Sequence, residues 1–129
     1  MTHGAVNPPA LGEAKGYSNG IVATGRTLYI AGQVGWDQQH HFADGFIAQF
    51  ELALANVLEV VTAAGGSPES IVRMTMYVTD KREYIAAQRD MGKVWKAKLG
   101  GWYPAMTLVQ VSGLLEDRAV LELEATAVL

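Results

Sequence analysis

The 129-residue sequence contains no cysteine, which excludes thiolate nucleophiles, cysteine-ligated zinc, iron–sulfur clusters and disulfides. It also lacks a basic patch: the 10 lysines and arginines are scattered and the net charge is −3, so nothing attracts a phosphate backbone. No stretch reaches the ~18 consecutive apolar residues of a membrane helix, and residues 1–10 lack the basic-then-apolar pattern of a signal peptide. We therefore expect a soluble cytoplasmic protein that binds neither nucleic acid nor membrane.

Apolar residues are plentiful. They make up 50% of the sequence against 18% charged residues, a composition that excludes intrinsic disorder. The length matches one ordinary domain of ~100–150 residues, so we expect a single domain over residues 1–129. The mean hydropathy of +0.11 is high for a small soluble chain, whose large relative surface calls for polar residues. Oligomerisation would bury this surplus.

Hydrophobic periodicity predicts two helices. From Phe46, apolar residues recur at three- and four-residue spacing until the glycines at 65–66, and Asp44 is the expected N-cap. A second helix follows, for which Asp80 and Glu83 form a capping box. Its apolar stripe ends at the next pair of glycines. Two helices that each carry a single apolar stripe must both cover a sheet.

Short β-branched and aromatic runs predict the strands of that sheet: residues 17–23, 27–33, 71–78, 105–111 and 119–128. Residues 1–16 resemble an extended arm, and the first two strands should form an antiparallel hairpin around Gly25. The predicted fold class is α+β, with the order β-β-α-β-α-β-β and both helices side by side on one face.

The opposite face of this sheet is uncovered within one chain. Along the last strand, alternate residues from Leu121 to Ala127 are apolar and suit the helix side, whereas Glu122 and Glu124 point the other way. Arg73 shares the uncovered face. Carboxylates mixed with apolar residues suit a subunit interface that contains a polar site. For the strand at 105–111, alternation alone does not decide which face points inward.

Several side chains are candidates for chemistry. Glu122 and Glu124 lie about 7 Å apart along the strand; they either hold a water for general-base catalysis or are solvated edge charges, and the sequence leaves both open. The pair His40–His41 is adjacent on an irregular segment, which does not favour a metal site, so we expect no metal. Trp36 and Trp102 lie in predicted loops and are candidates for lining a pocket or an interface.

Motifs spread over nearly the whole chain carry a family resemblance. They are Tyr17-Ser18, Ala31-Gly32-Gln33-Val34, Gln49, Ala55-Asn56-Val57, Pro104-Ala105 and Glu122-Leu123-Glu124-Ala125. In this order the motifs resemble those of the Rid family, also called YjgF or L-PSP. The resemblance implies a chorismate-mutase-like α+β fold. It further implies a homotrimer whose sheets form a central barrel, with three pockets at the subunit boundaries.

The resemblance also implies an activity. Well-known members hydrolyse reactive imines and enamines such as 2-aminoacrylate to a keto acid and ammonia, without a metal or organic cofactor. Tyr17 and Glu122 match site positions of the family. If the protein is a hydrolase, these are the expected catalytic residues, with Tyr17 assisting proton transfer and Glu122 positioning the attacking water. Gly32 matches a strand glycine whose backbone faces the pocket, and Gln88 aligns with a family asparagine.

One position departs from the family pattern. The arginine that binds the substrate carboxylate, two residues after the proline of the Pro-Ala-Arg motif, is Met106 here, and a cysteine often found two positions later is Leu108. A thioether cannot replace a bidentate guanidinium–carboxylate pair. Arg73 is a residue that could compensate. We expect the small-molecule contacts to come from the following residues: Met106, Leu108, Gln88, Gly32, Arg73 and Trp36.

Two functions therefore remain open. One is a hydrolase that deaminates a small imine or enamine other than 2-aminoacrylate. The other is a non-catalytic trimer that binds a small molecule. The endoribonuclease activity sometimes attached to the family name is disfavoured, because the sequence has a net charge of −3 and no basic stripe.

Overall fold

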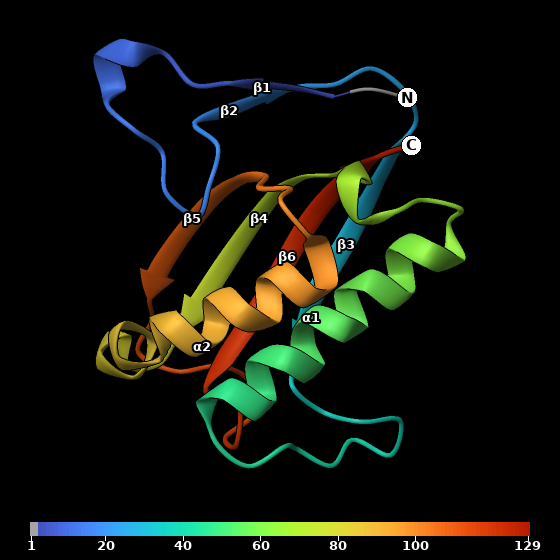
Figure 1. The fold of residues 1–129 in the computed structure, drawn as a ribbon. Helices are drawn as coiled ribbons and strands as arrows, with labels where there is room; N and C mark the ends of the chain where they lie inside the picture. The colour runs from blue at the N-terminus through green and yellow to red at the C-terminus, as the bar shows by residue number, and fades with distance from the viewer. Residues whose placement is uncertain (1–2) are drawn as a thin grey trace.

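The structure is a computed structural model that describes residues 3–129. A four-stranded sheet contains β3 (Thr27–Val34), β4 (Ile71–Val78), β5 (Ala105–Gln110) and β6 (Leu121–Val128), in the spatial order β3-β6-β4-β5. A separate two-stranded sheet pairs β1 (Gly4–Val6) with β2 (Gly20–Val22). The helices are α1 (Phe46–Ala63) and α2 (Lys81–Leu99), with short 3₁₀ turns at Pro9–Leu11 and Pro68–Ser70. Figure 1 shows this arrangement, which confirms the predicted α+β class and its order, with β1 in addition.

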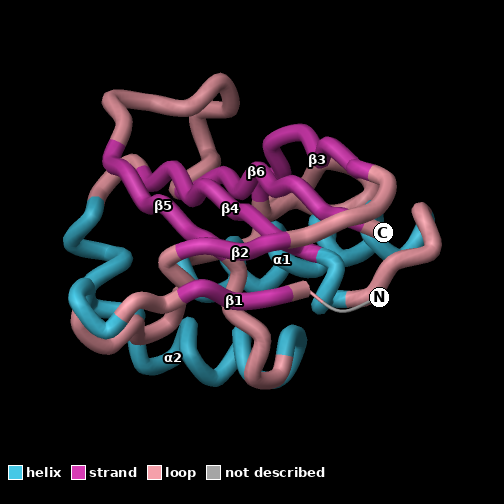
Figure 2. Tube along the Cα trace, turned by 90° about the horizontal axis from the view of Figure 1, so that it is seen from above, coloured by secondary structure: helices cyan, strands magenta, loops and turns pink. Residues whose placement is uncertain are grey.

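Both helices cover the same face of the four-stranded sheet (Figures 1 and 2). β6 pairs antiparallel with β3 and β4, while β5 pairs parallel with β4 at the edge. The parallel pair requires a crossover, which α2 supplies. The expectation that the helices lie side by side on one face is confirmed, because α1 and α2 contact each other.

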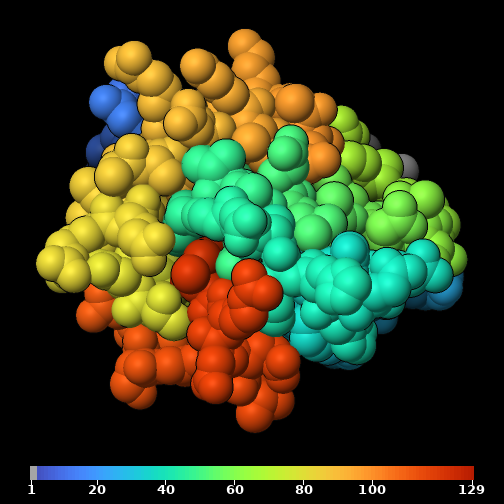
Figure 3. Space-filling model, turned by 90° about the horizontal axis from the view of Figure 1, so that it is seen from below, coloured from blue at the N-terminus to red at the C-terminus, as the bar shows by residue number. Residues whose placement is uncertain are grey.

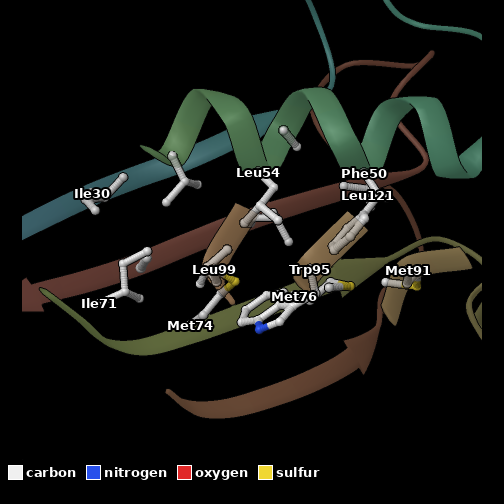
Figure 4. Packing of buried hydrophobic residues seen from close by; sticks show 14 of the residues in the cluster. Ile30, Phe50, Leu54, Ile71, Met74, Met76, Met91, Trp95, Leu99 and Leu121 are labelled. Atoms are coloured by element: carbon white, nitrogen blue, oxygen red, sulfur yellow. The ribbon is translucent and has the colours of Figure 1, made fainter. Parts of the chain in front are cut away.

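The core lies between the helices and the sheet (Figure 4). Phe50 and Leu54 of α1 meet Met74 and Met76 of β4 and Leu121 of β6, all of them buried. Among the described residues, α1 alone is long and apolar enough to cross a membrane, with a mean hydropathy of 1.5. A core helix passes the same test, and the buried face of α1 packs on this sheet.

The N-terminal strands differ from the prediction. The segment predicted at 17–23 forms a strand only over Gly20–Val22, and it pairs with β1, where Gly4 lies opposite Val22, instead of with β3. Gly25 is therefore not the turn of a hairpin. Ser18 explains the difference, because it is bridged to Ala105 at the start of β5 and so draws this segment away from β3.

The predicted cap of α1 is wrong. The N-cap is Gly45, whose φ of 88° lies in the left-handed region that favours glycine. The Asp44 carboxylate lies 3.6 Å from the Arg118 guanidinium instead. Figure 3 shows the two loops meeting at one end of the molecule, with the loop before α1 in cyan and the loop before β6 in orange-red.

The cap of α2 is confirmed in part. Asp80 accepts a hydrogen bond from the Arg82 backbone N–H at 2.9 Å, and the side-chain hydrogen bond from Arg82 is the main cause that lowers the pKa of Asp80. Glu83 was expected to close a capping box. Within residues 3–129, only its backbone N–H contacts the cap, donating to the Asp80 carbonyl at 3.1 Å.

β4 contains an irregularity that the sequence pattern missed. Strict alternation along this strand would place Val72 on the helix side together with Met74, Met76 and Val78. The register shifts between Ile71 and Arg73, so that Ile71 is fully buried while Val72 is half-buried. A β-bulge inserts one extra residue and changes which side chains point inward.

Candidate functional site

A cavity of about 380 Å³ lies between α2 and β5. The floor comes from α1 and β4, and the mouth is bordered by the segment that precedes β2. Four of the predicted site residues line it: Tyr17, Gln88, Met106 and Leu108. Residues separated by up to about 90 positions in sequence are thus gathered in one concave space of the size that small-molecule sites have.

Ser18 holds Tyr17 at this cavity. The Ser18 backbone N–H donates to the Pro104 carbonyl at 3.0 Å, and its hydroxyl donates to the Tyr103 carbonyl. Ser18 is buried, whereas Tyr17 is 38% exposed. Two hydrogen bonds to the residues just before β5 therefore fix the backbone next to Tyr17, a positioning role that the sequence analysis did not predict.

The pairing of β5 with β4 decides which face of β5 looks into the cavity. Met106 lies opposite Met74, and Leu108 lies opposite Met76. Met74 and Met76 are buried against the helices. Because neighbours in register point to the same side of a sheet, Met106 and Leu108 face α2.

Arg73 does not reach this cavity. It lies opposite Ala105, is exposed, and points to the sheet face that the helices leave bare. The idea that Arg73 compensates for Met106 within one chain is therefore wrong, because the two side chains lie on opposite faces. No ion pair of Arg73 with Glu122 or Glu124 occurs among the salt bridges of residues 3–129.

Glu122 and Gly32 form a second cluster on the bare face. Glu122 is half-buried and lies opposite Val34 on β3 and Tyr77 on β4. Its side chain covers the backbone of Gly32 so closely that a Cβ at that position would lie 2.7 Å from the Glu122 carboxyl carbon. Gly32 is thus the residue that gives the Glu122 carboxylate room on the strand. Glu122 does not line the cavity between α2 and β5.

Glu124 has a different partner. The Tyr77 hydroxyl donates to Glu124 Oε1 at 2.6 Å, and this hydrogen bond is the main cause that raises the pKa of Tyr77. Glu124 is exposed. The two glutamates therefore differ in their surroundings. The Glu122 side chain lies against the backbone of Gly32, whereas the Glu124 carboxylate accepts a hydrogen bond from the Tyr77 hydroxyl.

Trp36 lies in the loop before α1 and does not line the cavity. Its ring stacks on His40, with centroids 3.8 Å apart and an interplanar angle of 6°. Asn56 fixes the loop by donating to the carbonyls of Val34 and Trp36, at 3.1 and 2.9 Å. Residues 3–129 contain no group of three or more side chains that could hold a metal ion.

The tryptophan near the cavity is not the one expected. Trp102, a candidate for lining a pocket or an interface, donates its ring N–H to the Ile71 carbonyl at 2.7 Å. Trp95 of α2 is buried and also lines the cavity. Its ring lies parallel to that of Tyr103, with centroids 6.0 Å apart. Lys15 and Gly92 also line the cavity, and neither was predicted there; a glycine inside the α2 pattern was the available signal for Gly92.

The class of protein follows from this geometry. A mixed sheet covered on one face by two helices, with a cavity under the second helix and a carboxylate on the bare face, defines a YjgF-like α+β protein. A family model described as "Endoribonuclease L-PSP" matches residues 8–129. The chain belongs to this family, the Rid or YjgF family.

Individual relatives agree with this assignment. The mouse protein named 2-iminobutanoate/2-iminopropanoate deaminase is 32% identical over 123 residues, which cover 94% of this chain and 84% of the mouse protein. The crystal structure of the Rid-family protein YyfB from Yersinia pestis has a TM-score of 0.86 at 31% identity, with 100% of both chains covered. Escherichia coli TdcF, crystallised with bound serine, has a TM-score of 0.73 at 32% identity, covering 92% of this chain and 91% of TdcF.

Proposed function

We propose that this protein is a hydrolase that deaminates a small imine or enamine, and that its substrate is not 2-aminoacrylate. The observation that carries the proposal is the cavity between α2 and β5, which gathers Tyr17, Gln88 and Met106, three positions that the family resemblance assigns to the site. Family membership and the mouse relative named as an imine deaminase support the reaction type. Met106 argues against a small carboxylate as the only recognised group.

The chemistry needs no electron transfer. Water adds its oxygen to the imine carbon while the nitrogen gains a proton, which gives a carbinolamine. The nitrogen then gains a second proton, the carbinolamine hydroxyl loses its proton, and the carbon–nitrogen bond breaks, releasing ammonia and leaving a carbonyl. Glu122 takes the proton from the attacking water, and the Tyr17 hydroxyl passes a proton to the departing nitrogen. All atoms come from water and substrate, so the reaction consumes no further reactant.

One chain does not bring Glu122 and Tyr17 to the same space, because they lie on opposite faces of the sheet. We infer a homotrimer in which the Glu122 face of one chain borders the cavity of the next. Exposed apolar side chains on the bare face support this: Tyr29 is 80% exposed and Val109 39%, and both share that face with Glu122. Monomers rarely leave such patches uncovered.

Light scattering tests the assembly. A mass near three times 13.9 kDa at micromolar concentration is the expected result. A monomer would leave Glu122 separated from Tyr17 and would overturn the shared site.

Kinetics test the reaction. Imines are generated in situ by an amino acid oxidase, and their loss beyond spontaneous hydrolysis is measured. Glu122→Ala and Tyr17→Phe should each lower the rate by about tenfold to a thousandfold, the range of positioned acid–base groups. Glu124→Ala is the matched control, because it removes a carboxylate from the same strand face. Equal rates for Glu122→Ala and the natural protein would refute the role of Glu122.

Met106 favours a second function, the binding of a small molecule without turnover. A thioether carries no charge and accepts hydrogen bonds only weakly, so the cavity can retain an apolar ligand and still fail to orient an imino acid. Saturable ligand binding with no accelerated imine loss for any member of the panel would select this function. The net charge of −3 does not favour RNA as that ligand.

A further inference from the structure

We propose that Gly92 and Lys15 set the ligand class of the cavity between α2 and β5: an organic anion whose bulky apolar or aromatic group fills the space opened by Gly92 and whose carboxylate is bound by Lys15. The proposal deepens the proposed function, because it names the substrates as imines of amino acids with large apolar side chains. The mouse relative is named for imines with only a methyl or ethyl side group.

The walls of the cavity are largely apolar, and their methionine side chains can adapt in shape. Aromatic rings and methionine thioethers supply much of the lining: Tyr84, Trp95, Tyr103, Met76, Met91 and Met106. Methionine sulfur contacts aromatic rings favourably and adapts its shape to them. The volume of about 380 Å³ lies within the range of roughly 300–1,000 Å³ found for drug-sized ligands. A methyl or ethyl group would leave most of this wall uncovered.

The aromatic wall is fixed before any ligand binds. The Trp95 ring N–H donates to the Trp102 carbonyl at 2.9 Å, and Trp102 in turn donates to the Ile71 carbonyl of β4 at 2.7 Å. The Tyr103 ring lies parallel to that of Trp95, at an interplanar angle of 4°. Because these rings need not reorganise, an apolar ligand loses little free energy to ordering the site.

Gly92 gives an independent reason for a large ligand. It lies in the interior of α2, where glycine is a poor helix former. Packing does not require it, because a Cβ added at Gly92 would meet nothing within 4 Å. Gly92 does line the cavity. The missing side chain therefore leaves open space in the cavity instead of relieving a contact within the fold.

The charge comes from Lys15. Among the lining residues in the described part of the chain, it is the one side chain with a full positive charge. None of these lining residues is an aspartate or a glutamate. Lys15 takes part in no salt bridge among residues 3–129 and is exposed at the mouth. A ligand carboxylate at the mouth would thus meet a cation with no competing anion on the part of the cavity wall that the same chain supplies.

Binding of unreactive probes tests this ligand class separately from turnover. Calorimetry compares 3-phenylpropanoate with propanoate and with the neutral 3-phenylpropanamide. We expect 3-phenylpropanoate to bind at least about tenfold more tightly than propanoate, and about threefold to tenfold more tightly than the amide at low salt. Equal affinity for propanoate and 3-phenylpropanoate would overturn the proposal.

Variants of Lys15 and Gly92 assign the roles of these two residues. Lys15→Met should abolish the preference for the carboxylate over the amide, Lys15→Arg should keep it, and Lys93→Met, an exposed lysine of α2 outside the cavity, should not change it. Gly92→Leu should weaken 3-phenylpropanoate binding about tenfold while raising the melting temperature by about 2–5 °C, because leucine is the better helix former. Ala86→Leu, on an exposed part of α2, is its control. Unchanged binding in Gly92→Leu would refute the role of Gly92.

The outcomes separate the two proposals. Tight 3-phenylpropanoate binding without accelerated loss of any imine supports this ligand class and refutes the deaminase. Accelerated loss of 2-iminobutanoate, with no gain for the imines of phenylalanine or methionine and no probe binding, supports the deaminase and refutes this ligand class.

Discussion

Gln49 links three parts of the molecule through its buried amide, and replacing it tests how the Glu122 strand is held. Its Nε2 donates to the carbonyls of Ala43 and Arg118, at 3.2 and 3.0 Å, and its Oε1 accepts from the Val120 N–H at 3.0 Å. Gln49 is only 4% exposed. The amide therefore joins α1 to the loop before it and to the residues that lead into β6.

Gln49→Met removes these hydrogen bonds with little change in side-chain length. Each bond contributes about 1 kcal/mol net, and buried partners left without a hydrogen bond cost about 1–3 kcal/mol each, so we expect a loss of roughly 3 kcal/mol in the free energy of unfolding. A chain of this size has a total of roughly 6–19 kcal/mol. The melting temperature should fall by roughly 10 °C.

Urea and thermal denaturation at one fixed protein concentration measure this loss, since the stability of an oligomer depends on concentration. Gln39→Met is the control, because Gln39 is exposed and, among residues 3–129, only its backbone N–H takes part in a hydrogen bond, to Asp37. A loss below about 1 kcal/mol for Gln49→Met, or the same loss in both variants, would refute the reasoning.

Three further changes test other contacts. Gly32→Ala should displace the Glu122 carboxylate, because the new Cβ would lie 2.7 Å from its carboxyl carbon. The rate of imine hydrolysis should fall by about tenfold or more while the melting temperature changes little. An unchanged rate would show that catalysis does not depend on this position of the Glu122 carboxylate. Met106→Arg should raise 2-aminoacrylate hydrolysis by about tenfold to a hundredfold, and no gain would show that the cavity does not hold the substrate carboxylate there. The pKa of Tyr77 is raised from 10.0, mainly by its hydrogen bond to Glu124; this contribution to stability is complete below the ordinary pKa and is lost as pH rises through the raised one. Glu124→Gln should lower the pKa of Tyr77, measured by tyrosinate absorbance, and an unchanged titration would contradict the assigned bond.

The helices were predictable because their signals are local. The apolar stripe that begins at Phe46 repeats every 3.6 residues, which is the period of an α-helix. The helix was expected to end at the glycines at 65–66, and Gly65 has a left-handed φ of 87°, a conformation that favours glycine. The same holds for Asp80, whose carboxylate caps α2. Asp44 shows the limit of such signals, because its ion pair with Arg118 depends on a loop from another part of the chain.

Strand pairing and the cavity were harder to predict, since they depend on contacts far apart in sequence. Nothing near residues 4–6 indicates that they pair with Gly20–Val22, or that Ser18 is held by residues just before β5. The orientation of Met106 follows from its register with Met74, which alternation within β5 could not decide. Lys15 belongs to no periodic pattern, so only the fold places it at the cavity mouth.

The position of β6 in the middle of the sheet has a consequence for how the chain folds. β6 is the last strand in sequence, yet it lies between β3 and β4 in the sheet. Thr27, for example, pairs with Val128, about 100 residues away. Pairings between such distant residues slow folding. Until β6 inserts, β3 and β4 each present an unpaired edge to other chains. We therefore expect slow recovery of the combined fluorescence of the three tryptophans after an early return of helical signal. Aggregation during refolding should grow with protein concentration. Simultaneous recovery of both signals within the fastest phase would contradict this order of events.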